Sequence, residues 1–246
     1  MNTVMQTMLA HVSVRQFTEQ PVSTEILENL IRCGQSAASS SFIQAVSVIH
    51  VTQAHHRQQI AELAGGQAWV VAAPVFLVFC ADLQRVNYAC VKNELGALEG
   101  QTEHFITATV DTALVAQNVL LAAESMGLGG VFIGGIRNNP QVVCDLLELP
   151  EQVYPVFGMC LGWPATTNAV KPRFPVQTIL HKDRYLLGPV AAQVDSYDQQ
   201  MQAYYQSRGS NQRVAATWSV QTAAAVQKKQ RPHMLKFLQT RGLLLR

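Results

Sequence analysis

The first apolar pattern along the chain is that of a helix. Ser23 can cap its start, because a serine oxygen accepts a hydrogen bond from the free N–H groups of the first turn. Apolar side chains then recur at helical spacing, at Ile26, Leu27, Leu30 and Ile31. We therefore predict a helix that packs one face on the core and ends at the polar run 36–41.

Four further segments predict β-strands. Residues 46–51 are rich in β-branched side chains, and residues 75–80 are continuously apolar, which is typical of a strand covered on both faces. Residues 131–133 form a short strand, and residues 153–163 form a longer one that Pro164 closes. We expect 75–80 to be the central strand.

A long apolar helix is predicted over 107–126, where Gly127 stops it. Asp111, Gln117, Asn118 and Glu124 interrupt its apolar stretch 110–126, so we expect a buried helix that is too short and too polar to cross a bilayer. Further helices are predicted over 140–147, 190–206 and 232–239.

Alternating strands and helices without a repeat or a linker predict one α+β domain over 1–246, with a central mixed sheet flanked by helices. A helical C-terminal extension is expected from about 190 to 246. Because it shows neither a strand nor a core of its own, we expect it to pack on another subunit.

Composition narrows the class of protein. Hydrophobic residues make up 48% and charged residues 14%, which favours a folded chain with part of its surface covered by a second copy, so we expect a homodimer. The formal charge is +2, from 18 basic and 16 acidic residues spread along the chain, which argues against nucleic acid as a partner. Five cysteines without a C-x-x-C pair, and no signal-peptide pattern, predict a cytoplasmic protein.

Common catalytic signatures are absent from the sequence. There is no G-x-S-x-G, no H-E-x-x-H and no P-loop. An enzyme that leaves its chemistry to a bound flavin needs donors and glycines to hold the ring and phosphate, rather than a nucleophile or a metal. We therefore looked for donor and glycine segments.

Three such segments lie in the first third of the chain. In an extended backbone His11, Ser13 and Arg15 share one side, where they suit a phosphate. Ser39, Ser40 and Ser41 offer hydroxyls, and Gln67 follows two glycines that allow a flat ligand to approach. Taken singly, each also fits an ordinary interpretation as a solvated edge or a turn.

Three more segments follow. Phe132, Ile133, Gly134 and Gly135 stand at a strand end, where main-chain N–H groups can face a ring; tight packing is the alternative explanation of these glycines. Lys171 and Arg173 flank a stiff proline and suit an anion, although they are also ordinary surface cations. Arg208 and Arg213 stand in a Gly/Ser/Asn loop that suits the 2′-phosphate of NADPH, or is simply a basic loop.

Together these segments, in this order, resemble the NADPH-dependent oxygen-insensitive nitroreductase and flavin reductase P group of the nitroreductase superfamily. The resemblance runs nearly end to end. Its motifs are His11-x-Ser-x-Arg15-x-Phe17, Ser39-Ser-Ser-Phe42, Gly65-Gly-Gln67, Ala122-Ala-Glu-Ser125, Gly127-Leu-Gly-Gly130, Ile133-Gly-Gly-x-Arg-Asn-Asn139, Leu161-Gly-Trp-Pro164, Lys171-Pro-Arg173, Arg208-Gly-Ser-Asn211 and Arg231-Pro-His233.

The resemblance implies a nitroreductase-like homodimer with FMN at the subunit interface and a C-terminal extension that embraces the partner. It also implies ping-pong transfer of electrons from NADPH, through flavin N5, to nitroaromatics or quinones, with no catalytic side chain. The implied FMN ligands are His11, Ser13, Arg15, Ser39, Ser40, Ser41, Gln67, Phe132, Ile133, Gly134, Gly135, Lys171 and Arg173. Arg208 and Arg213 would bind NADPH.

Two departures from the pattern bear on these roles. Val12 stands where relatives commonly carry arginine, and Val214-Ala-Ala216 follows Arg213 where a second basic residue is expected. Alternatives therefore stay open: a flavin reductase that supplies reduced FMN, a non-catalytic flavin-binding protein, or an α/β module without flavin.

Overall fold

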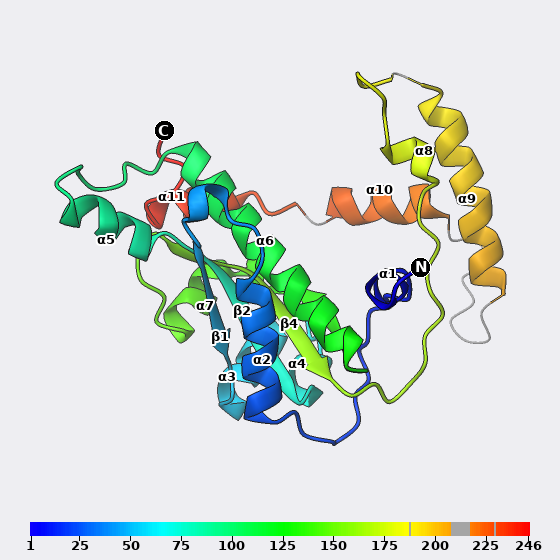
Figure 1. Cartoon of the computed structure of the whole chain (residues 1–246), viewed down its shortest axis with the longest axis horizontal. Helices are drawn as coiled ribbons and strands as arrows, with labels where there is room; N and C mark the ends of the chain where they lie inside the picture. The colour runs from blue at the N-terminus through cyan, green and yellow to red at the C-terminus, as the bar shows by residue number, and fades with distance from the viewer. Residues whose placement is uncertain (187, 208–216, 229) are drawn as a thin grey trace. The chain divides into compact units, whose positions relative to one another are not determined.

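The computed structural model describes residues 1–186, 188–207, 217–228 and 230–246. These residues form two compact units, seen along the chain in Figure 1. Unit 1 comprises residues 1–168 and 231–246, and unit 2 comprises the described residues from 169 to 230. The C-terminal segment 231–246 therefore returns to the unit that holds the sheet.

Unit 1 is built on a four-stranded sheet in the order β1-β2-β4-β3. Its strands are β1 (Val46–His50), β2 (Val75–Asp82), β3 (Gly129–Ile133) and β4 (Val153–Gly162). Every residue of β2 is buried, which confirms the predicted central strand. A mixed sheet was expected, but the four strands pair antiparallel, and the parallel component is one isolated bridge between Ser13 and Gly130.

Unit 1 also contains helices, several of which lie against the sheet (Figure 1). They are α1 (Thr3–Leu9), α2 (Thr24–Gln35), α3 (Ala54–Leu63), α4 (Trp69–Ala72), α5 (Gln84–Lys92), α6 (Thr102–Ser125), α7 (Pro140–Leu146) and α11 (His233–Thr240), with 3-10 turns η1 (Ser40–Phe42) and η2 (Gly134–Asn138). Ser23 caps α2 as predicted, since its hydroxyl oxygen accepts the Ile26 N–H at 3.2 Å.

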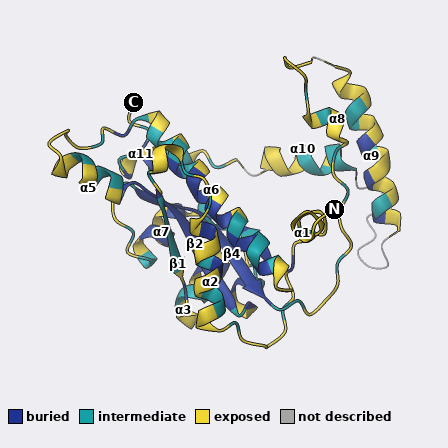
Figure 2. Ribbon diagram, viewed as in Figure 1, coloured by how far each residue is buried: buried dark blue, intermediate teal, exposed yellow. Residues whose placement is uncertain are grey.

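The long helix α6 begins five residues before the predicted start and packs against α2 and β2. Over its full length, Thr102–Ser125, the helix is long and apolar enough to cross a membrane by length and composition alone, unlike the shorter stretch 110–126 on which the expectation rested. One side of α6 nevertheless lies in the core of unit 1 (Figure 2). At the crossing with α2, a Cβ on Gly34 would lie only 2.6 Å from the Val119 side chain, so glycine allows the close approach.

The C-terminal helix α11 is fixed to the start of β4. Arg241, which is 9% exposed, donates to the carbonyl oxygens of Leu149 at 2.6 Å, of Val153 at 3.3 Å and of Pro150. In return, the Gln152 N–H donates to the Arg241 carbonyl oxygen at 2.7 Å. These contacts explain why the last residues belong to unit 1.

Unit 2 contains α8 (Val176–Ile179), α9 (Val190–Gln206) and α10 (Trp218–Lys228). Its described residues form no strand, as expected. The expectation that this region lacks a core is wrong, however. Tyr197, Met201 and Tyr205 of α9 are buried, and Phe174 and Trp218 pack against them. Phe174 lies 4.0 Å from Tyr197, measured between ring centroids.

Candidate functional site

The segment from His11 to Arg15 is anchored where α6 turns into β3. The Val14 N–H donates to the Gly130 carbonyl oxygen at 2.9 Å, and His11 Nδ1 lies 2.5 Å from Glu124 Oε1. Val14 is 2% exposed, whereas Ser13 and Arg15 are exposed. Ser13, Val14 and Arg15 alternate as predicted, whereas His11 and Val12 are both half-buried, so two of the three predicted phosphate donors lie at the surface.

Two further contacts involve predicted site residues: Arg15 lies over the Trp69 ring, and Gly135 meets Gln67. The Arg15 guanidinium lies 5.7 Å from the centre of the Trp69 ring, and Gln67 Nε2 donates to the Ala64 carbonyl oxygen at 2.7 Å. A Cβ on Gly135 would lie 2.4 Å from that same oxygen and 2.6 Å from Gln67 Nε2. The glycine is therefore required by the close approach of two segments.

Phe132 and Ile133 complete the predicted strand end. Ile133 is fully buried in the core, so only its main chain is available to a ligand. Phe132 is half-buried and packs edge-on against Phe157, with ring centroids 5.0 Å apart.

The turn η2 is held by residues near the C-terminus, a role that sequence reasoning missed. Arg231 Nη2 donates to Asn138 Oδ1 at 2.9 Å and to the Gly134 carbonyl oxygen at 3.2 Å. His233 Nε2 lies 3.0 Å from the Arg137 carbonyl oxygen. Burial, and then the nearby charge of Arg231, lower the pKa of Arg137. The Arg231-Pro-His233 motif was the sequence signal for these contacts, but the resemblance assigned no function to it.

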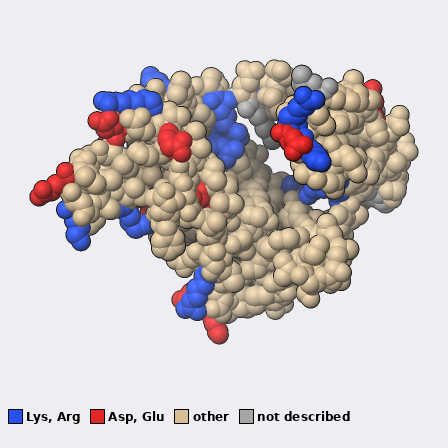
Figure 3. Space-filling model, turned by 45° about the horizontal axis from the view of Figure 1, so that its top comes forward, with Lys and Arg blue, Asp and Glu red and all other residues tan. Residues whose placement is uncertain are grey.

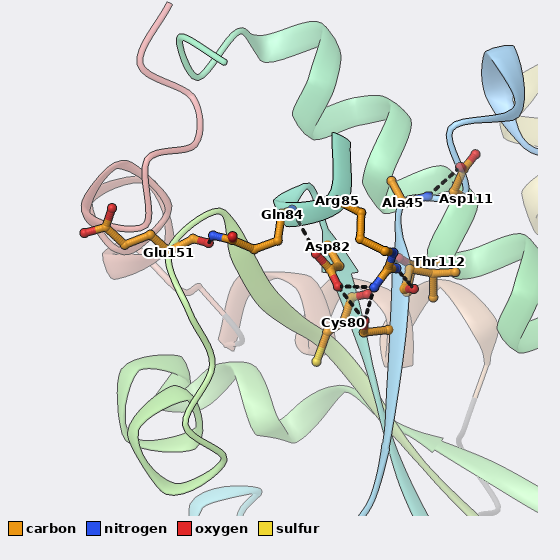
Figure 4. Close-up of polar contacts among 10 residues, drawn as sticks. Ala45, Cys80, Asp82, Gln84, Arg85, Asp111, Thr112 and Glu151 are labelled. Carbon is orange, nitrogen blue, oxygen red and sulfur yellow. Dashed lines mark hydrogen bonds and ion pairs between the residues drawn. The ribbon is translucent and has the colours of Figure 1, made fainter. Parts of the chain in front are cut away.

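The serine loop, residues 39–44, is organised by Asp111, a buried residue of α6. Ser39 Oγ donates to Asp111 Oδ2 at 2.6 Å, and the N–H groups of Ser40 and Ala45 donate to the same carboxylate at 3.2 Å each. Figure 4 shows the contact of Asp111 with Ala45. Left-handed φ angles of 48° at Ser41 and 51° at Gln44 make this a tightly bent loop.

A cavity lined by both polar and apolar side chains lies beside the serine loop. Its volume is about 330 Å³, and its polar lining includes Ser39, Gln44, Ser47, Arg85 and Asp111. Arg85 is held in place because its Nη1 donates to Asp82 Oδ2 at 3.0 Å, a contact drawn in Figure 4.

Within one chain, the serine loop and the His11–Arg15 segment do not meet. Their anchors, Asp111 and Glu124, are 13 residues apart on α6, which corresponds to about 20 Å along a helix axis. The serine loop also leads into β1, whereas Ser13 bridges to β3, at the opposite edge of the sheet. The two predicted parts of the site therefore occupy separate places on unit 1.

Lys171 and Arg173 belong to unit 2. Lys171 Nζ lies 5.5 Å from the centre of the Tyr205 ring, and Arg173 Nη1 donates to the Lys171 carbonyl oxygen at 3.3 Å. The predicted NADPH ligands Arg208 and Arg213 lie outside the described residues. Within the described part of the chain, no group of three or more His, Cys, Asp or Glu side chains is arranged to hold a metal ion.

Charge on the molecule is sparse. On the face drawn in Figure 3, most of the surface is uncharged, and Lys and Arg side chains form small separate groups. Among the described residues, Arg15, Lys171 and Arg173 have no carboxylate within ion-pair distance. Three of the cations predicted to bind a phosphate are thus not neutralised by the protein.

Comparison with known proteins places this arrangement in a family. The model of the nitroreductase family matches residues 8–163, and that of the nitroreductase family C-terminal domain matches residues 171–246. The chain belongs to the nitroreductase family. The resemblance and the α+β nitroreductase fold predicted from the sequence are both confirmed.

Individual nitroreductase-family relatives align over nearly their whole length. The chain is 45% identical to the NADPH-flavin oxidoreductase of Vibrio harveyi over 246 residues, covering 100% of both chains. It is 42% identical to the oxygen-insensitive NADPH nitroreductase of Salmonella typhimurium over 243 residues, covering 98% of both. The structure of the NADPH:FMN oxidoreductase from Vibrio harveyi complexed with NAD⁺ superimposes with a TM-score of 0.89 at 42% identity, covering 100% of both chains.

Proposed function

We propose that this protein is an FMN-dependent oxidoreductase that transfers electrons from NADPH to nitroaromatics, quinones or related acceptors by a ping-pong mechanism. The observation that carries the proposal is that Ser13 bridges to Gly130 of β3, while Gln67 and Gly135 meet just beyond the end of the same strand. The names of relatives at 45% and 42% identity, over nearly the whole chain, support the same activity.

The residues present fit FMN. Its phosphate needs donors and positive charge, and Arg15, Lys171 and Arg173 are cations without a carboxylate partner among the described residues. Its ring and ribityl chain need hydrogen-bonding groups, and the Gln67 amide lies beside Gly135 just beyond the end of β3.

FMN, when bound, supplies the hydride-accepting ring, and the side chains hold and orient it. His11, Ser13, Arg15, Lys171 and Arg173 would bind the phosphate and polar edge. Gln67 and the main chain from Phe132 to Gly135 would line the ring and ribityl chain. Arg208 and Arg213 would bind the 2′-phosphate that distinguishes NADPH from NADH.

The proposed site is completed by a second copy of the chain. Ser39, Ser40 and Ser41 lie about 20 Å along α6 from the His11 anchor, so the serine loop that lines a given FMN would come from the partner. Exposed apolar side chains on α6, namely Ile106, Val110 and Leu114, provide a surface for that homodimer. The segment from about 190 would then contact the partner, and the protein would work in the cytoplasm.

A second candidate function is that of a flavin reductase whose acceptor is free FMN. The name of the Vibrio harveyi relative, an NADPH-flavin oxidoreductase, favours it. A flavin-binding protein without turnover is the remaining candidate, because Val214-Ala-Ala216 departs from the expected basic pattern after Arg213.

One experiment separates these functions. The purified protein is examined by its visible spectrum and then titrated anaerobically with NADPH or NADH. We expect a yellow protein that NADPH bleaches faster than NADH; a colourless protein that takes up no FMN overturns the proposal. Comparing a nitroaromatic, a quinone and free FMN as reoxidants then ranks the two enzymatic functions, and a yellow protein that neither nucleotide bleaches is a binding protein.

A further inference from the structure

The pair formed by His11 and Glu124 is unusual for its position. Glu124 stands in the last turn of α6, where the carbonyl ends of the helix disfavour a negative charge. Its side chain is only 11% exposed. It borders a cavity of about 380 Å³ whose other lining residues include Val12, Val14 and Leu128. A carboxylate in such a place is costly unless a cation or strong donor compensates it.

Among the described residues, His11 is the group that provides this compensation. The distance of 2.5 Å from His11 Nδ1 to Glu124 Oε1 requires a hydrogen between them, and an ionised carboxylate only accepts. With Glu124 as the carboxylate, the hydrogen is assigned to Nδ1, and Nε2 is the ring nitrogen that remains for a ligand.

A phosphate group also accepts hydrogen bonds, so Nε2 must carry a hydrogen when it contacts one. A ring with hydrogens on both nitrogens is a cation, and the Glu124 carboxylate is placed to balance its charge. The glutamate and the phosphate would thus occupy opposite ends of one imidazolium.

The main chain supports the same arrangement. The Val14 N–H bond to Gly130 lies three residues from His11, and Glu124 in the last turn of α6 and Gly130 in β3 stand on either side of the short connection between them. Gly129 is packed so closely on Val14 that a Cβ there would lie 2.4 Å from a Val14 methyl group. Two anchors therefore fix the backbone on either side of Ser13.

We propose that Glu124 is a positioning residue for the flavin phosphate, which holds His11 as the doubly protonated ring that donates from Nε2. This inference rests on the proposed function. A glutamine would keep a hydrogen bond to Nδ1 but lose the charge. If Glu124 only ties the His11 segment to α6, Glu124→Gln should leave FMN binding unchanged. If Glu124 balances the charge of the His11 ring, the same substitution should weaken FMN binding.

The test compares FMN with riboflavin, which lacks the phosphate. The full chain is stripped of flavin, and both dissociation constants are measured from the change in flavin fluorescence. For Glu124→Gln we expect the affinity for FMN to fall about tenfold, with riboflavin affinity changed less than twofold. The matched control is Glu103→Gln, an exposed glutamate at the other end of α6, which should change neither.

Distinct outcomes overturn the inference and the proposed function. If Glu124→Gln weakens both flavins by the same factor, or neither, Glu124 is not a positioning residue for the phosphate. If the unaltered chain binds neither flavin, the proposed function itself is wrong. A measurement that needs no variant is the ¹⁵N spectrum of the His11 ring in the FMN-bound protein: two protonated nitrogens support the inference, and one bare nitrogen overturns it.

Discussion

The Ser39 hydroxyl donates to the Asp111 carboxylate across 2.6 Å, and this bond begins a set that shapes the serine loop. Asp111 is 2% exposed and also accepts the N–H groups of Ser40 and Ala45. An asparagine at position 111 would place an NH₂ group, which only donates, where one of the carboxylate oxygens now accepts these hydrogen bonds. We expect Asp111→Asn to lower the free energy of unfolding by about 3 kcal/mol, measured by urea denaturation. An unchanged midpoint, with Glu103→Gln as the control, contradicts this.

Arg231 and Asn138 join the C-terminal segment to η2 through two hydrogen bonds, at 2.9 and 3.1 Å. Because each residue is the other's partner, removing both should cost less than the sum of the single losses. A double-mutant cycle with Arg231→Ala and Asn138→Ala should give a coupling free energy of about 1 kcal/mol in thermal unfolding. Strict additivity would show that the contact contributes nothing to the turn.

The backbone at Gly135 lies so close to the Ala64 carbonyl oxygen that a methyl group does not fit between them. A Cβ would lie 2.4 Å from that oxygen, so Gly135→Ala must move α3 or η2. We expect a loss of about 2 kcal/mol in the free energy of unfolding and weaker FMN binding. The control is Gly188→Ala, since the nearest atoms to a Cβ there are 4.0 Å away. Equal stability of the two variants would refute the crowding argument.

The cysteines should differ sharply in reactivity. Burial raises the pKa of Cys144 to about 11 and that of Cys160 to about 12, so at pH 8 the reactive thiolate is about one part in a thousand or less of each. Cys33 is exposed. We expect a thiol reagent to modify Cys33 in the native protein, and Cys144 and Cys160 only in denaturant. Cys33→Ser should remove the rapid reaction; rapid labelling of Cys160 would contradict its burial.

The same two thiols should make stability depend on alkaline pH. Their pKa values are higher in the folded chain than the ordinary value of 9.0, so the unfolded chain releases the protons first. Stability should be unaffected below about pH 9 and should fall as the pH rises towards 11 to 12. Urea denaturation of the unaltered protein and of Cys160→Ala across this range measures the effect, and the variant should show a shallower loss.

Sequence patterns predicted the elements whose burial is strongly periodic or continuous, such as α2 and β2. They missed α1, a helix of seven residues, although Val4, Met5, Met8 and Leu9 recur there at helical spacing and stay exposed. The small helices α4 and α8, of four residues each, are too short to show one.

The sequence predicted the hydrogen-bond donors of the candidate site, but not the residues that hold those donors in place. Asp111 appeared in the sequence only as a polar interruption of an apolar stretch, and Glu124 as another interruption and as part of the Ala122-Ala-Glu-Ser125 motif, without a role. In the structure these two carboxylates anchor the serine loop and the His11 segment. Pairing partners more than 70 residues apart depends on the tertiary fold, which a single sequence does not reveal. A charged residue inside an otherwise apolar helix was nevertheless the available signal.

The exposed apolar side of α6 gives a final prediction, which concerns assembly. Ile106, Val110 and Leu114 are 48%, 50% and 42% exposed at helical spacing, on the helix that also carries both anchors. A carboxylate at a buried apolar interface is strongly unfavourable. We expect Leu114→Asp to convert the proposed homodimer to a monomer in sedimentation velocity, while Val91→Asp, at an exposed valine of α5, should leave the sedimentation coefficient of the unaltered protein unchanged.

Flavin binding should follow the dimer, because the serine loop of one chain and the His11 segment of the other would form one site. The monomer produced by Leu114→Asp should therefore bind FMN at least tenfold more weakly than the dimer, although its own His11, Ser13 and Arg15 are unchanged. A monomer with undiminished FMN affinity would show that one chain suffices, and the serine loop would then have no part in the site. A Leu114→Asp protein that remains dimeric would instead place the subunit interface elsewhere on the surface.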